Sequence, residues 1–387
     1  MTTTRPENEL LICVARRSLS GDIAARIASL AATRIDWNYL INTATQQGVM
    51  PLLYSHLSSA CPQCVPREVL ARLRNAFVAN SKSCLLLFGE LRKLLRLFSE
   101  KGITAVAFKG PLLSVEAYGD LCLRQAGDLD ILIKKHDFSL AKEILVTAGY
   151  RLATPLTKSQ EASHLRFHCE IPFLSNGLSV VDLHWGLSPK SFRFALNPRQ
   201  VMERCESTII QGTSLLTFAR EDTILYLCFH GGKHYWSRLE WISSLAEFIR
   251  TTQNINWSKI LERANESHGR RMLIVGLMLA RKLGGVEIPE SILSDGGEFE
   301  SLSKYTEGIQ ARIFVDTSGP PRSVEAFRSN LKIMDRKRDA IISFLRAIFV
   351  PTISDWQELA LPGALYPLYY LFRPLRLLKK YSANGRG

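Results

Sequence analysis

The chain has 387 residues, of which 46% are hydrophobic and 22% are charged, so it is long enough for two or three domains and a substantial core. Its 49 lysine and arginine residues outnumber its 36 acidic residues, and the net charge of +13 favours acidic partners (nucleotides, nucleic acid or an anionic membrane surface) over a basic surface without a partner. Because no apolar stretch reaches the length of a membrane-spanning helix and residues 1–7 lack a secretory apolar run, membrane-spanning and secreted classes are disfavoured, and the cytoplasm is the expected compartment.

Residues 1–82 are predicted to form an N-terminal helical region. Apolar residues recur at helical spacing in its segments, which Gly48 and Pro51 separate. Of the eight cysteines in the chain, Cys61 and Cys64 are the pair with C-x-x-C spacing. A single such pair is at most half of a zinc site, and a redox motif needs a thioredoxin-like context, so two ordinary thiols are the simpler interpretation.

Residues 83–215 are predicted to form a small mixed-sheet core. An apolar helix over residues 82–101 is followed by a strand over residues 103–108 and by the turn Lys109-Gly110-Pro111. Proline is favourable in the first turn of the next helix, because its missing N–H would be unpaired there anyway. A strand, a glycine turn and a helix N-terminus together bind anions. Lys109 therefore either binds phosphate or, as the structural alternative, caps the strand end.

A second short strand carries two aspartates in the segment Gly127-Asp128-Leu129-Asp130. Alternation along a strand places Asp128 and Asp130 on one face, and the apolar residues between and after them on the other. Two carboxylates on a buried strand repel each other, and a divalent cation is their natural partner. Arg124 either clamps a phosphate with paired N–H groups or forms an ion pair with one of these aspartates.

A hairpin is predicted to bring a third carboxylate to this strand. Residues 164–171 and 178–185 have the composition of strands, and Asn176-Gly177 between them is a hairpin signal. Asp182 would then lie beside Asp128 and Asp130. Three carboxylates suit Mg²⁺, with Mn²⁺ as the substitute ion, and the metal would keep positions for water and phosphates. His184 shares a face with Asp182 and is better suited to contact the substrate than to ligate Mg²⁺.

Residues 216–350 are predicted to be a C-terminal helical domain. The phrase from His230 to Trp236 contains Lys233 and His234. Its two histidines, four residues apart, have the spacing of a zinc fragment, but no acidic third ligand is nearby. Helix packing through its tryptophan is the structural alternative for this phrase.

Residues 351–387 are predicted to be a basic aromatic tail. Leucines and tyrosines in it are interleaved with the basic residues Arg373, Arg376, Lys379 and Lys380. Such a segment can lie on an anionic membrane surface, contact a protein partner, or pack against its own chain. Prolines 362, 367 and 374 are expected to prevent one continuous helix.

The ordered set of these segments resembles the nucleotidyltransferases with the DNA polymerase β-like fold, and more closely a bacterial branch described as uncharacterised nucleotidyltransferases. The matching phrases run over roughly residues 30–250: Ile35-Asp36-Trp37, Gly48-Val49-Met50-Pro51-Leu52, Lys109-Gly110, Arg124 to Asp130, Asp182-Leu183-His184-Trp185 and His230 to Trp236. The resemblance implies that the Lys109-Gly110 turn approaches a triphosphate and that the phrase from His230 to Trp236 lines the nucleotide or acceptor cleft. Family members often have an aspartate beyond Trp241, where this chain has Ser243-Ser244; this departure points to a changed acceptor side or to reduced activity.

We therefore predict an α+β fold, with a small mixed β-sheet nucleotidyltransferase core flanked by N- and C-terminal helical regions. The expected reaction is Mg²⁺-dependent transfer of a nucleoside monophosphate from a nucleoside triphosphate to an unidentified small-molecule, peptide or protein acceptor. The predicted catalytic and metal-binding residues are Asp128, Asp130 and Asp182. The predicted nucleotide-binding residues are Lys109, Gly110, Arg124, His184, Lys233 and His234. A catalytically reduced nucleotide-binding scaffold and a nucleic-acid tailing polymerase are the alternatives; the second is less favoured because no RNA-reading module is recognisable.

Overall fold

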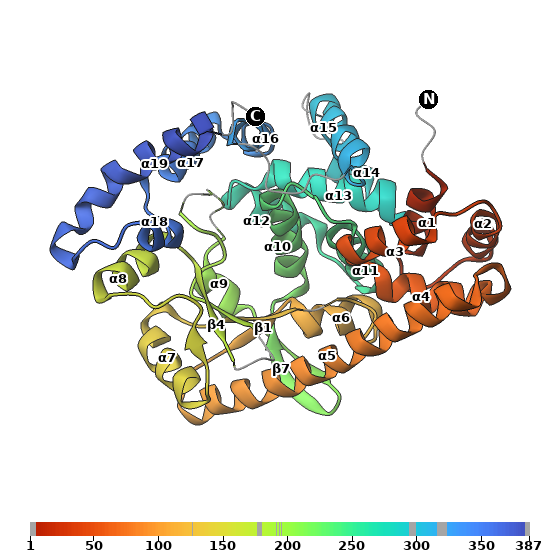
Figure 1. Cartoon of the computed structure of the whole chain (residues 1–387), viewed down its shortest axis with the longest axis horizontal. Helices are drawn as coiled ribbons and strands as arrows, with labels where there is room; N and C mark the ends of the chain where they lie inside the picture. The colour runs from red at the N-terminus through yellow and green to blue at the C-terminus, as the bar shows by residue number, and fades with distance from the viewer. Residues whose placement is uncertain are drawn as a thin grey trace.

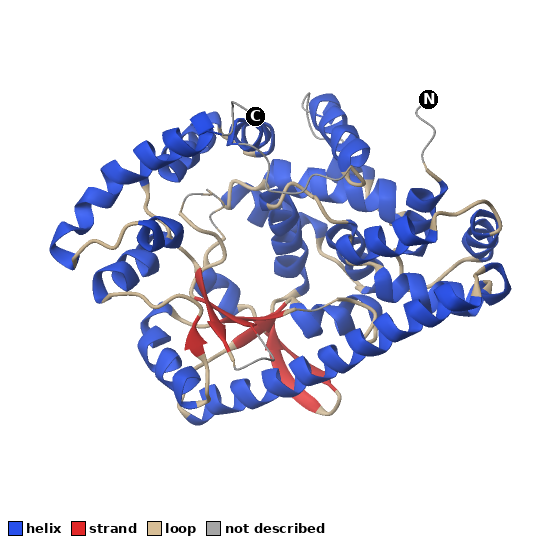
Figure 2. Ribbon diagram, viewed as in Figure 1, coloured by secondary structure: helices blue, strands red, loops and turns tan. Residues whose placement is uncertain are grey.

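The computed structural model describes residues 5–125, 127–175, 180–190, 192, 194, 196–293, 299–315 and 323–383. Helices make up most of these residues, and the strands gather in one region of the molecule (Figure 2). Helices both precede and follow the sheet in the chain. The predicted α+β class, with a small mixed sheet between helical regions, is confirmed.

The N-terminal region consists of helices. They are α1 (Pro6–Val14), α2 (Gly21–Ala31), α3 (Trp37–Gln46), α4 (Met50–Ala60), the 3₁₀ helix η1 (Pro62–Cys64) and α5 (Arg67–Glu100). Asp36 starts α3, because its side chain accepts a hydrogen bond from the N–H of Tyr39. Helix α5 is 34 residues long and runs along one side of the molecule, from α4 to the sheet region (Figure 1). The domain limit expected between residues 82 and 83 falls inside α5 and stays a prediction.

The central sheet has five strands in the order β1-β2-β5-β4-β3. Their bounds are β1 (Val106–Phe108), β2 (Asp128–Leu132), β3 (Arg151–Leu152), β4 (Glu170–Leu174) and β5 (Val180–His184). Strands β2 and β5 are parallel, whereas the other neighbours are antiparallel. Residues paired across neighbouring strands point their side chains to the same face of a sheet, so the register determines which residues share a face.

One face of this sheet is apolar and packs against two helices. Leu129 and Ile131 of β2 belong to one buried cluster with Leu91 of α5 and with Phe138 of α7 (Phe138–Thr147). The short helix η2 (Lys135–Asp137) leads into α7. Helix α6 (Gly110–Tyr118) connects β1 to the segment before β2. Because α5 and α7 cover the apolar face, the polar side chains of the strands lie on the other one.

Residues 164–167 belong to helix α8 (Lys158–Phe167), so the strand predicted over residues 164–171 is wrong in its first half. Thr157 and Gln160 form a capping box, in which each side chain accepts a hydrogen bond from the other residue's N–H. The cap favours a helix over the following residues, including 164–167, although their apolar and histidine residues form a pattern typical of a strand. Strands β4 and β5 pair antiparallel as the hairpin predicts. Asn176 and Gly177, the predicted turn residues, lie outside the described residues.

The second half of the chain begins with a small separate sheet and continues as helices. Its elements are α9 (Pro198–Glu203), β6 (Glu206–Ile210), β7 (Thr213–Thr217), α10 (Arg220–Lys233), α11 (Leu239–Thr251), α12 (Trp257–Glu266), α13 (Arg270–Gly284), α14 (Glu290–Leu293) and α15 (Phe299–Arg312). A large buried cluster joins these helices to α1–α4 and includes Leu53 and Leu245. Helices α1–α4 and the helices of the second half of the chain therefore share a core. The expected limit at residue 215 falls inside β7 and also stays a prediction.

The last elements are α16 (Ser323–Ile333), α17 (Lys337–Phe349), α18 (Ile353–Glu358), the 3₁₀ helix η3 (Gly363–Leu368) and α19 (Tyr369–Ala383). The described part of the tail is three helical elements, α18, η3 and α19, rather than one continuous helix. Pro362 precedes η3, but Pro374 lies inside α19 and does not end it, which differs from the expectation for that proline. Arg376 contacts the buried carboxylate of Asp355 at 2.6 Å, which attaches α19 to α18. In the part of the chain that the structure describes, no helix has both the length and the apolarity that a membrane crossing needs.

Candidate functional site

The polar face of the central sheet brings the three predicted aspartates together. Asp130 of β2 is the register partner of Asp182 of β5, so both side chains lie on one face. Asp128 lies two residues before Asp130 on the same strand and therefore shares this face. Leu129 and Ile131 point to the opposite face and are buried there, which fixes the register of β2.

Asp130 is the most buried carboxylate of the three, with 3% of its surface exposed. Its Oδ1 atom lies 2.7 Å from Nζ of Lys109 and 3.0 Å from Nε2 of His184. Burial by itself raises the pKa of Asp130, but the Lys109 ammonium and the His184 hydrogen bond outweigh burial and hold the pKa at about 2. Asp130 is therefore a fixed negative charge held between two basic side chains.

Asp128 and Asp182 titrate differently because they lack such close partners. Burial raises the pKa of Asp182 to about 6, and the negative charge of Asp130 adds to that shift. Burial and Asp130 also raise the pKa of Asp128, while Lys109 and Arg124 oppose the shift. The face thus holds more negative charge than its own cations balance, which is the electrostatic setting in which carboxylates bind a divalent cation.

The Lys109-Gly110 turn lies directly beside these carboxylates. Lys109 has a φ of 59° and Gly110 a φ of 48°, both in the region that favours glycine. A Cβ on Gly110 would lie 3.0 Å from the carbonyl oxygen of Asp128, so the turn approaches β2 closely. Lys109 adopts this backbone conformation as a non-glycine residue, which costs about 1 kcal/mol or more. The strained turn directs the Lys109 ammonium to Asp130 at the N-terminus of α6.

Arg124 contacts neither aspartate in the way that the ion-pair alternative predicted. Its guanidinium lies 2.7 Å from Oε1 of Glu240 in α11, and it donates a hydrogen bond of 3.3 Å to the carbonyl of Gly110. Arg238 contacts the other oxygen of Glu240 at 2.9 Å. Arg124 therefore connects the turn to the C-terminal helices. Its contact with phosphate stays a prediction.

Glu170 is a residue of this face that the sequence reasoning missed. It is the register partner of His184, and its Oε2 atom lies 3.2 Å from Nδ1 of that histidine. Its other oxygen, Oε1, lies 3.8 Å from Nζ of Lys233. The predicted hairpin already implies this contact, because a turn near residue 177 pairs residue 170 with residue 184. The strand predicted over residues 164–171 contains Glu170 but does not by itself identify its cross-strand partner.

Lys233 and His234 lie at the end of α10, near the edge of this face. The ammonium of Lys233 lies near Glu170 of this face. Burial, together with the charges of Lys233 and Lys109, lowers the pKa of His234 to about 4. The neutral His234 ring lies against His230 and Trp241. The phrase also has a packing role, because a Cβ on Gly231 would come within 2.4 Å of the buried ring of Trp236. The contact of Lys233 and His234 with nucleotide stays a prediction.

Ser243 and Ser244 are buried in α11, away from solvent. The hydroxyl groups of Ser243 and Tyr118 lie 2.8 Å apart, and that of Ser244 lies 3.4 Å from the same tyrosine oxygen. These contacts join α11 to α6, the helix that follows the Lys109-Gly110 turn. The serine pair therefore has a packing role behind that helix.

A comparison with protein families matches residues 33–285 to the family described as "Uncharacterised nucleotidyltransferase". The match begins before α3, ends one residue after α13, and so includes the sheet, the turn and the polar face. No curated protein matches the chain.

Proposed function

Because the chain belongs to the uncharacterised nucleotidyltransferase family, we propose that it transfers a nucleoside monophosphate from a nucleoside triphosphate to an acceptor oxygen. In this reaction a hydroxyl or carboxylate oxygen of the acceptor attacks the α-phosphorus. The bond from the α-phosphorus to the bridging oxygen breaks, and pyrophosphate leaves with that oxygen. A hydroxyl acceptor also loses its proton to a base. The acceptor is a small molecule, a peptide or a protein side chain.

The observation that carries this proposal is the set of three aspartates on one face of β2 and β5. Asp128, Asp130 and Asp182 offer oxygen ligands alone, and such a set fits Mg²⁺ or Mn²⁺. When bound, the metal supplies positive charge to the phosphates and to the oxygens at which charge develops. Asp182 is the best-placed proton acceptor, because its pKa is raised to about 6 and no lysine or arginine of the described structure lowers it, whereas Lys109 and Arg124 lower that of Asp128.

The Lys109-Gly110 turn is assigned to the triphosphate. The N-terminus of α6 provides free N–H groups there, and Lys109 adds a positive charge that is partly buried. Lys109 neutralises Asp130 in the described structure, and a triphosphate would offer its ammonium a second anionic partner. Arg124 supports the turn through Gly110, so its contribution includes positioning.

A second candidate is nucleotide binding without transfer, as in a scaffold protein. It is favoured by the contacts of Lys109 and His184 with Asp130, because both compete with a metal ion for that carboxylate. Isothermal titration with each nucleoside triphosphate, with and without Mg²⁺, measures binding separately from chemistry. Tight binding that is independent of Mg²⁺, without any transfer, would favour this second candidate.

The transfer assay uses each of the four α-labelled ribonucleoside triphosphates with Mg²⁺ or Mn²⁺ and fractionated cell extract as the source of acceptor. Asp182→Asn should lower label transfer and pyrophosphate release by about 100-fold and change nucleotide affinity little, because its charge acts mainly in the transition state. Asp137→Asn, a matched change outside the polar face, should transfer normally. Equal turnover by Asp182→Asn and the wild-type chain would exclude the three-aspartate site.

A further inference from the structure

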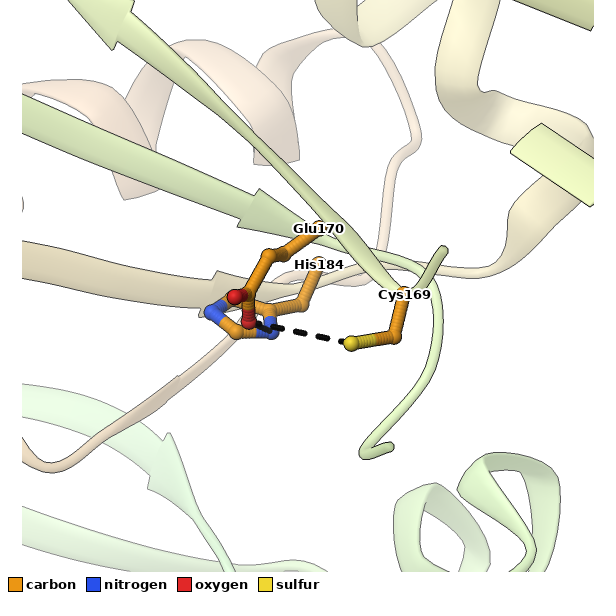
Figure 3. Close-up of side chains that lie close together, drawn as sticks. All are labelled: Cys169, Glu170 and His184. Atoms are coloured by element: carbon orange, nitrogen blue, oxygen red, sulfur yellow. Dashed lines mark hydrogen bonds and ion pairs between the residues drawn. The ribbon is translucent and has the colours of Figure 1, made fainter. Parts of the chain in front are cut away.

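Three side chains with metal-binding atoms converge beside the aspartate face. Among the residues that the structure describes, Cys169, Glu170 and His184 place Sγ, a carboxylate oxygen and a ring nitrogen all within 4.8 Å of one another. Figure 3 shows the thiol directed toward the histidine ring and the carboxylate. Oε2 of Glu170 lies 3.7 Å from Sγ of Cys169 and 3.2 Å from Nδ1 of His184. The three predicted aspartates are not part of this group.

Both ring nitrogens of the buried His184 side chain lie against carboxylates. Nε2 contacts Asp130, and an ionised carboxylate only accepts hydrogen bonds, so Nε2 carries the hydrogen and donates it. Nδ1 lies 3.2 Å from Oε2 of Glu170. A ring nitrogen and a carboxylate oxygen buried at this separation need a positive charge between them, which either a proton on Nδ1 or a metal ion supplies.

We infer that Cys169, Glu170 and His184 form a binding site for a zinc-type divalent cation, distinct from the proposed magnesium site. Thiolate, imidazole and one carboxylate are ligands for Zn²⁺ rather than for Mg²⁺. Zinc bonds to these atoms are about 2.0 to 2.3 Å long, so neighbouring ligand atoms in a tetrahedral site lie about 3.3 to 3.6 Å apart. The observed separations of 3.2 and 3.7 Å from Oε2 are close to that range. Three protein ligands leave the fourth position for water or substrate.

The surrounding contacts match those of a metal-binding histidine. Such a histidine usually donates its other N–H to a carboxylate, which fixes the ring, and Asp130 accepts that bond here. Lys233 lies near Oε1 of Glu170, so it leaves Oε2 free for the ion. The site also follows from the fold: Glu170 and His184 are register partners, and the carbonyl of Cys169 accepts the N–H groups of Trp185 and Gly186. The inference does not depend on nucleotidyl transfer.

The test is Co²⁺ titration of the full-length chain after treatment with a chelator, followed by absorption spectroscopy. Co²⁺ bound to a thiolate gives a ligand-to-metal charge-transfer band in the near ultraviolet, and Zn²⁺ should abolish it by displacement. Cys169→Ser should remove the band and weaken binding by about 100-fold or more, since even indirect partners of a metal ligand cost about 10- to 100-fold. Glu170→Gln should weaken binding and keep the band. Cys13→Ser, a change in α1, should leave both unchanged.

A second control separates this site from the C-x-x-C pair. Cys64→Ser should keep the charge-transfer band, and loss of the band in that variant would assign the signal to Cys61 and Cys64 and overturn the proposal. Thermal unfolding with and without Zn²⁺ shows whether Cys169→Ser still folds: Zn²⁺ should raise the melting temperature of the wild-type chain and not that of the variant. A band in folded Cys169→Ser, or no band in the wild-type chain, would also overturn it.

Discussion

Asp130 illustrates how much of the polar face depends on a single buried charge. Its carboxylate contacts Lys109 and His184, and its negative charge contributes to the raised pKa values of Asp128 and Asp182. A buried ion pair is strongly destabilising when one partner is removed, because the other charge is left without compensation. Asp130 is therefore a structural as well as a proposed catalytic residue. The alternation of residues on β2 predicts its face, whereas its partners follow from the fold.

Asp130→Asn should lower the free energy of unfolding by about 3 kcal/mol, because it leaves the Lys109 ammonium partly buried without a counter-charge. Lys109→Met in the same chain should recover about half of that loss. Urea unfolding of the two variants and the wild type measures both effects. Asp128→Asn, whose carboxylate forms no ion pair among the described contacts, should cost less than about 1 kcal/mol. If Asp130→Asn is as stable as the wild type, the ammonium is solvated and the buried pair contributes no stability.

Glu116 in α6 should make stability depend on pH near neutrality. Burial raises its pKa to about 7, while the hydroxyl of Thr217 opposes the shift by donating a hydrogen bond to it. The folded state therefore binds more protons than the unfolded state between about pH 4.5 and pH 7, and stability falls as pH rises through that range. The free energy of unfolding of the wild type should therefore be larger at pH 5 than at pH 8. Glu116→Gln should reduce this difference by about 1 to 2 kcal/mol, because solvent reaches part of the side chain and screens its charge.

Urea unfolding at the two pH values measures this change. Glu262→Gln, at an exposed position of α12, is the matched control and should leave the pH dependence as in the wild type. An unchanged pH dependence in Glu116→Gln would mean that other groups cause it.

At the scale of elements, the strands of the site could be predicted because their polar and apolar residues alternate. Asp128, Leu129 and Asp130 fix the faces of β2, and the hairpin brings Asp182 to the same face. Contacts between distant elements could not be predicted in this way. The partner of Arg124 is Glu240, which is 116 positions later in the chain, and no local pattern connects them. The start of α8 depends on the capping box of Thr157, whose signal was outweighed by a strand-like pattern after it.

Gly48 should be required for the contact between the N-terminal helices and α11. Its φ is 75°, and a Cβ there would lie 2.1 Å from Oε2 of Glu240. Gly102 has the same φ of 75°, and no atom lies within 4 Å of the position that a Cβ would take. Gly102→Ala therefore measures the cost of the backbone conformation alone, without a steric clash. Gly102→Ala should cost about 1 kcal/mol. Gly48→Ala should cost at least about 2 kcal/mol more, because it also displaces the buried carboxylate that binds Arg124.

Urea unfolding of the two alanine variants gives the difference directly, since the shared φ cancels. The structure requires a larger loss for Gly48→Ala, and equal losses would show that Glu240 moves aside without cost. In that case the contact between Gly48 and Glu240 would not hold Arg124 in place.

At the scale of the whole molecule, helices from both halves of the chain pack into one core, whereas one face of the C-terminal helix α19 is exposed. The large buried cluster joins helices from both halves of the chain. The tail differs, because Leu371, Leu375 and Leu378 of α19 are 65–66% exposed. They recur at helical spacing, so they form one row on a single face. No acidic residue follows Glu358 in the chain, whereas five basic residues do.

We propose that this leucine row, defined as Leu371, Leu375 and Leu378, binds an anionic membrane surface. A helix can lie in the membrane interface when basic residues accompany an apolar face, and in α19 the exposed Lys379 lies beside the leucine row by helical spacing. The attachment of α19 to Asp355 through Arg376 leaves the leucine row facing outward. The surface would attract the chain through its charge and retain it by burying the leucines.

The prediction is that the full-length chain floats with vesicles that contain phosphatidylserine, and that flotation falls as salt concentration rises. Changing the leucine row to glutamine should weaken binding by about 100-fold or more, because each leucine loses apolar burial. Ile209→Gln is the matched control: Ile209 is 76% exposed, lies on β6 away from α19, and should not affect flotation. Equal flotation of the wild type and the leucine-row variant would exclude the membrane surface. A concentration-dependent dimer without flotation would assign the row to a second copy of the chain.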